Sequence, residues 1–223
     1  MGQIIDLKAS DGFACKAYVA TPSGKPRGGM VIVQEIFGAN HHIKATADLY
    51  AAEGYLSIAP AFFDRVQPGI DLGYSDAEIA KAREYVPKVN MDNVMLDVNA
   101  AIKHVAGAGK VGLVGYCWGG TVAFVSAAKA QGLACTVAYY GGGVGANIAL
   151  APKVPVMFHW GASDHAIPME TVRKIEAAHP SIPSYVYTPA GHGFNCDERG
   201  SYHEATATLA RARSLEFIRK HVG

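Results

Sequence analysis

The chain has 223 residues, of which 50% are hydrophobic and 17% are charged, so its composition is that of a folded globular protein rather than a disordered one. Its 20 basic and 19 acidic residues leave a formal net charge of +1, which offers no basic stripe for a phosphate backbone and argues against nucleic-acid binding. The length suits a single core, and we expect residues 1–223 to form one domain.

The cysteines indicate a reducing environment. They stand at positions 15, 117, 135 and 196, with no C-x-x-C pair and no other short spacing. Disulfide frameworks and zinc sites usually show closer spacing, so the sequence predicts a cytoplasmic protein with no metal site and no cofactor. Asp6, Lys8 and Asp11 also stand where a signal peptide would need an apolar core.

Two uncharged stretches, 111–128 and 130–152, approach the length of a membrane span. Clusters of glycine break each stretch into a short apolar run, a turn and a second segment. Strands that are buried on both faces of a sheet produce such runs. We therefore expect buried strands here and no membrane partner.

The predicted elements alternate along the chain. Short β-type runs predict strands at 3–7, 14–20, 29–34, 55–59, 111–115, 135–140, 154–160 and 184–188. The first two are separated by a turn near residues 10–12, which predicts an antiparallel hairpin at one edge of the sheet. Helices are predicted near 41–53, 75–88, 91–106, 118–131, 169–179 and 201–221. This alternation favours a mostly parallel, doubly wound sheet with helices on both faces, whose ligand site lies beyond the carboxyl ends of the strands.

A cysteine stands where one of these strands passes into a helix. The segment 115–119 (GYCWG) has the form of the nucleophile elbow G-x-S-x-G, with Cys117 in place of serine. Small flanking residues are needed because the nucleophile lies on a sharp turn. The helix N-terminus favours negative charge, and the N–H of Trp118 is placed to donate to an oxyanion. Cys117 is therefore the predicted nucleophile, and a small buried core residue is the alternative.

Two further polar residues follow strands in the order that a catalytic triad requires. Asp164 comes after the strand at 154–160, and His192 comes after the strand at 184–188. Nucleophile, acid and histidine in this order are typical of α/β-hydrolases. Asp164 would hold the imidazole in one tautomer, and His192 would move a proton between nucleophile, leaving group and water.

A fourth candidate is Glu35, which follows the strand at 29–34. An acid at the end of a buried strand is costly unless it is paired, so a structural ion pair is one interpretation. The other uses its position, because the loop after this strand supplies the second oxyanion donor, here the N–H of Ile36. Glu35 would then lie beside the nucleophile.

At these residues the sequence resembles the dienelactone hydrolase (carboxymethylenebutenolidase) family. The similar segments are 34–38 (QEIFG), 111–120 (VGLVGYCWGG), 164–168 (DHAIP) and 191–194 (GHGF). The resemblance implies an eight-stranded α/β-hydrolase fold without a large lid, acting on a small ester or lactone. We also expect a monomer or small homo-oligomer. It also implies that Glu35 takes the proton of the Cys117 thiol when substrate binds.

The resemblance further implies a substrate carboxylate held by two arginines, and here the chain departs from the family. One arginine is expected four residues after the catalytic histidine, where this chain has Cys196, and Arg199 is the nearby substitute. The other is expected after the fourth strand, where Arg83 and Lys81 are candidates. We therefore expect Arg199 and Arg83 to bind substrate, although a solvated loop is the simpler interpretation of 197–199.

Two other functions stay open. Gly141-x-Gly143-x-x-Ala146 follows a predicted strand and approximates a dinucleotide fingerprint, which would suit a nucleotide-binding α/β oxidoreductase. That fingerprint requires a helix next, but Pro152 and Pro155 leave no room for one of useful length. The second alternative is a non-catalytic α/β binding protein. His41 and His42 open a predicted helix and are expected at its surface, with a position at the mouth of the site as the alternative.

Overall fold

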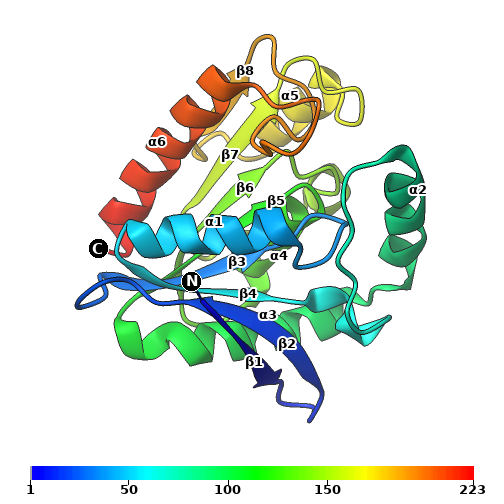
Figure 1. Cartoon of the computed structure of the whole chain (residues 1–223). Coiled ribbons are helices and arrows are strands. Elements are labelled where there is room, and N and C mark those ends of the chain that lie inside the picture. The colour runs from blue at the N-terminus through cyan, green and yellow to red at the C-terminus, as the bar shows by residue number, and fades with distance from the viewer. Residues whose placement is uncertain (1) are drawn as a thin grey trace.

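The computed structural model describes residues 2–223, which form an eight-stranded mixed sheet (Figure 1). Across the sheet the strands are β1 (Gln3–Lys8), β2 (Ala14–Ala20), β4 (Tyr55–Pro60), β3 (Gly28–Val33), β5 (Val111–Tyr116), β6 (Leu133–Tyr139), β7 (Val156–Gly161) and β8 (Ser184–Tyr187). β2 runs antiparallel to both of its neighbours, and all other pairs are parallel. The predicted edge hairpin and the mostly parallel sheet are therefore confirmed.

Helices lie on both faces of the sheet, as the alternating pattern predicted. α1 (His41–Ala52) and α6 (Glu204–His221) lie on one side, and α3 (Met91–Val105) and α4 (Trp118–Lys129) lie on the other (Figure 1). The remaining helices are α2 (Asp76–Tyr85) and α5 (Met169–Ala178), together with short 3₁₀ turns at Phe62–Arg65, Val86–Lys88, Ala106–Ala108 and Gly145–Asn147. The arrangement is doubly wound.

Local chemistry explains where these elements begin and end. Ser75 caps α2 with a capping box that includes Glu78, and α2 ends just before Pro87, whose ring cannot continue an α-helix. On α3 the buried side chains recur every three or four residues, which places one apolar face on the sheet. The central strands β3 and β5 are buried along their whole length, whereas β1 at the edge is mostly exposed.

The two uncharged stretches have become ordinary parts of the fold. Residues 111–128 form β5 and most of α4, and residues 130–152 include β6 and the 3₁₀ turn at Gly145–Asn147. Within residues 2–223, no helix has both the length and the apolar character that a membrane crossing requires. Each stretch is divided into short segments, as predicted, although the first divides at Cys117 and its glycines lie within β5 and α4.

Candidate active site

Cys117 lies on a sharp turn between β5 and α4. Its backbone has φ 56° and ψ −117°, in the left-handed region that side chains other than glycine rarely adopt. The neighbouring glycines make this turn possible. A Cβ on Gly115 would come within 1.8 Å of the Gly119 carbonyl oxygen, and one on Gly119 would come within 2.5 Å of the carbonyls of Val33 and Gln34. The G-x-C-x-G spacing is therefore a packing requirement of the strained turn.

His192 and Asp164 meet Cys117 at the carboxyl ends of the strands. His192 Nε2 lies 3.1 Å from Cys117 Sγ, and His192 Nδ1 lies 2.8 Å from Asp164 Oδ2. The other carboxylate oxygen of Asp164 accepts hydrogen bonds from the N–H groups of Ala166 and Ile167, at 2.8 and 3.1 Å. These bonds fix the carboxylate and thereby the imidazole. The structure brings together the three residues predicted from chain order.

The surroundings of His192 favour its charged form. Burial disfavours the imidazolium, but the neighbouring Cys117 and the hydrogen bond to Asp164 outweigh burial and raise the pKa of His192 to about 10. An imidazole in this position readily accepts the proton of the adjacent thiol, because the resulting imidazolium is stabilised by a buried carboxylate.

This environment leads to a testable titration. NMR of ring-labelled histidine, with His192 assigned among the nine histidines by a His192→Gln variant, should show its imidazolium persisting until about pH 10. In Cys117→Ala the pKa should fall, because the largest contribution that raises it is removed. An imidazole that titrates near its ordinary value of about 6.5 in both proteins would contradict the coupling.

The two predicted oxyanion donors follow adjacent strands. Ile36 follows β3 and Trp118 follows β5, and these strands pair in parallel with Val33 opposite Gly115. As the first residue of α4, Trp118 has an N–H with no acceptor inside its own helix. Its indole packs edge-on against the rings of Phe62 and Phe63, which accommodate the large side chain.

Glu35 is paired with Arg199 rather than with the thiol. Its carboxylate is 1% exposed and accepts a hydrogen bond of 2.9 Å from Arg199 Nη1 and one of 3.3 Å from the Tyr74 hydroxyl. Within residues 2–223 no hydrogen bond joins Glu35 to Cys117. The guanidinium also lies over the rings of Phe37 and Tyr74, at 5.6 and 5.7 Å from their centroids. The ion-pair interpretation of Glu35 therefore describes the structure in the absence of substrate.

Arg199 is close enough to Cys117 for their charges to interact. Burial lowers the pKa of Arg199, but Glu35 and then Cys117 raise it, with a net increase. The solvated-loop interpretation is wrong for Arg199, whose side chain is only 17% exposed, although it holds for Asp197 and Glu198. Arg83 and Lys81 are exposed on α2, and no ion pair or hydrogen bond of either side chain occurs within residues 2–223. Substrate binding by Arg83 stays a prediction.

Tyr74 is a site residue that sequence reasoning missed. It lies in the loop before α2, where no strand end or motif marks it. Its hydroxyl joins Glu35 to Asn40, which donates to it at 3.1 Å and also caps α1. Burial and the charge of Glu35 raise the pKa of Tyr74, so the hydroxyl stays a donor to the carboxylate.

Comparison with known proteins agrees with this geometry. The family model described as "Dienelactone hydrolase family" matches residues 15–222, nearly the whole chain. The chain belongs to the dienelactone hydrolase family. Carboxymethylenebutenolidase from Pseudomonas putida is 34% identical to it over 227 residues, which cover 96% of this chain and 94% of that relative. The resemblance deduced from four short segments is therefore confirmed.

Solved structures give the same result for the fold. A putative dienelactone hydrolase from Klebsiella pneumoniae superposes with a TM-score of 0.84 at 29% identity, covering 97% of both chains. A dienelactone hydrolase-like promiscuous phosphotriesterase from metagenomic libraries superposes with a TM-score of 0.78 at 18% identity, covering 100% of this chain and 99% of the other, and shows likeness of fold alone. The predicted α/β-hydrolase fold, with eight strands and no large lid, is confirmed.

Proposed function

We propose that this dienelactone hydrolase family member cleaves an ester or lactone through a covalent thioester on Cys117. The observation that carries the proposal is the unbroken series of contacts from Cys117 Sγ through His192 to Asp164, 3.1 and 2.8 Å long, at the strand ends. A thiol, an imidazole and a buried carboxylate in this order are the components of nucleophilic acyl transfer. The carboxymethylenebutenolidase relatives support the same class of reaction.

The proposed reaction proceeds in two halves. Cys117 Sγ, with its proton on His192, attacks the carbonyl carbon as a thiolate, and the N–H groups of Ile36 and Trp118 stabilise the oxyanion. Collapse of this intermediate breaks the carbon–oxygen ester bond, and His192 gives its proton to the departing alkoxide. Water then loses a proton to His192 and attacks the thioester, which releases the acid and restores the thiol. The α4 N-terminus favours the negative charge that develops in each half.

The Glu35–Arg199 pair supports a substrate that carries a carboxylate. Arginine binds a carboxylate through two parallel hydrogen bonds, and the group that occupies Arg199 in the free protein is itself a carboxylate. An anionic substrate would compete with Glu35 for the guanidinium. Glu35, once released, would be a base beside Cys117 and would assist its deprotonation.

Acylation of purified protein tests the proposal. We expect intact-protein mass spectrometry during turnover of a panel of lactones, aryl esters and thioesters to show one acyl adduct, which peptide mapping assigns to Cys117. Cys135→Ala, which removes a thiol buried in β6, serves as the matched control and should acylate like the wild type. Prolonged chelation should leave the rate unchanged, because no proposed step uses a metal or other cofactor. Turnover without any adduct on Cys117, or an adduct on another residue, would refute the covalent route.

The rival oxidoreductase function receives no comparable support. The segment after Gly141 forms only the three-residue turn Gly145–Asn147, as the prolines predicted, and a dinucleotide fingerprint needs a crossover helix there. From the sequence we also propose a cytoplasmic, monomeric or small homo-oligomeric protein of one domain. Neither nucleic acid nor membrane is among its proposed partners.

A further inference from the structure

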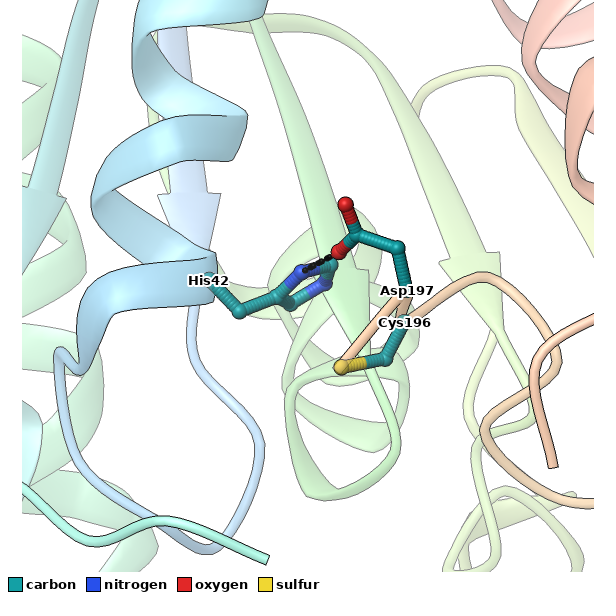
Figure 2. Close-up of side chains that lie close together, drawn as sticks. All are labelled: His42, Cys196 and Asp197. Atoms are coloured by element: carbon teal, nitrogen blue, oxygen red, sulfur yellow. Dashed lines mark hydrogen bonds and ion pairs between the residues drawn. The ribbon is translucent and has the colours of Figure 1, made fainter. Parts of the chain in front are cut away.

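Three side chains with metal-binding atoms lie together outside the proposed triad. They are His42 near the start of α1 and Cys196 and Asp197 in the loop after His192 (Figure 2). Their ligand atoms all lie within 4.8 Å of one another. His42 and Cys196 are buried and Asp197 is exposed. The surface position expected for His42 is therefore wrong, because its ring points inward toward this loop.

The imidazole of His42 has a polar atom that the protein leaves unsatisfied. Nδ1 lies 3.2 Å from Asp197 Oδ1, but Nε2 is buried and has no hydrogen-bond partner within residues 2–223. A buried ring nitrogen without a partner costs about 1–3 kcal/mol. The pairing of Nδ1 with Asp197 leaves this second nitrogen unsatisfied.

We propose that His42, Cys196 and Asp197 form a binding site for a thiophilic divalent cation, with Zn²⁺ as the best fit. Imidazole nitrogen, thiolate sulfur and carboxylate oxygen are the three ligand types of protein zinc sites. A thiolate and a carboxylate together carry two negative charges, which balance the charge of the ion. Tetrahedral ligands at about 2.0–2.3 Å from one Zn²⁺ lie roughly 3.3–3.8 Å apart, so a cluster within 4.8 Å needs movements of only about 1 Å.

The site is accessible to ions. A cavity of about 610 Å³ opens between α1 and α6, and His42 and Asp197 form part of its wall. Neither Cys117 nor His192 lines this cavity. Solvent in the cavity provides a path of entry that does not pass Cys117 or His192, and a water molecule for the fourth position of the ion.

Binding at this site should release a proton. A cysteine binds a metal ion as the thiolate, and an ordinary thiol, with a pKa of about 8.5, is mostly protonated at neutral pH. The ion then replaces the proton on Sγ, and one proton passes to solvent for each ion bound. Metal affinity should rise with pH for this reason.

Cobalt titration of the whole purified chain tests the proposal. Co²⁺ bound by a thiolate gives a charge-transfer band in the near ultraviolet, and Zn²⁺ should displace the Co²⁺ and abolish the band. We expect one ion per chain, with Cys196→Ser removing the band and His42→Gln or Asp197→Asn weakening binding by at least about tenfold to 100-fold. Cys117→Ala is the matched control and should keep the band, because Cys117 is not a ligand.

Each outcome decides the proposal independently of hydrolysis. Absence of a thiolate band in the wild type, or a band that persists in Cys196→Ser, would overturn the site. A band lost in Cys117→Ala would place any ion at the triad instead. The Asp197 side chain is 69% exposed, so Asp197→Asn should fold normally. This variant therefore tests the site even if the variants of the buried residues His42 and Cys196 do not fold. Circular dichroism and the melting temperature verify the fold of every variant.

Discussion

Cys117→Ala should lower kcat/KM for an activated ester by about 10⁴-fold or more. Removal of the nucleophile from a triad costs several powers of ten, because the remaining groups no longer act as a unit. The substitution also relieves little strain, since alanine must adopt the same backbone with φ 56° between β5 and α4. Steady-state kinetics on folded protein, normalised by its concentration, measures the effect.

The other thiols supply controls for this experiment. Cys15 lies in β2 and Cys135 in β6, and both are buried. Burial raises the pKa of each thiol to about 12, so neither is a nucleophile at neutral pH. Cys15→Ala and Cys135→Ala should keep most of their activity per folded molecule even if the small cavity lowers the melting temperature. Near-wild-type turnover by Cys117→Ala would end the covalent mechanism.

Arg199→Ala should discriminate between substrates by their charge. For a carboxylate-bearing lactone we expect a fall in kcat/KM that corresponds to a loss of roughly 2–4 kcal/mol of transition-state stabilisation. This is the cost of losing one partner of a buried charge pair. A neutral aryl ester should scarcely be affected, because it does not use the guanidinium. The difference between the two substrates is the measurement, since general damage to the site would slow both equally.

The buried carboxylate of Glu35 requires a second variant. The Glu35 side chain is only 1% exposed, so without Arg199 its carboxylate would be buried with no cation beside it. An unpaired buried charge strongly destabilises the folded protein. The double variant Arg199→Ala/Glu35→Gln removes both charges and should restore stability while keeping the loss on the anionic lactone. Arg83→Ala and Lys81→Ala test the exposed cations of α2. A charge-dependent loss in one of these variants, together with none in Arg199→Ala, would move the anion site to α2.

The sequence alone was sufficient for the order and type of the elements and for the three residues of the proposed triad. The strands were recognisable because parallel strands buried on both faces are continuous apolar runs. The helix predicted at 75–88 was too long, because Pro87 ends α2 at Tyr85. Cys117 was recognisable because its turn depends on glycines within two residues. Asp164 and His192 followed from chain order at strand ends, since the carboxyl ends of parallel strands share one edge of the sheet.

Only the tertiary structure decided which distant side chains pair around that centre. Glu35 and Arg199 are separated by 164 positions, and Tyr74 joins them from a loop that has no motif. The same reason explains why the cluster of His42, Cys196 and Asp197 was not foreseen. Spacing rules detect ligands on one short segment, but here α1 and the loop after His192 supply them from 155 positions apart. Contacts between loops depend on the path of each loop over the sheet, which packing determines and local sequence patterns do not encode.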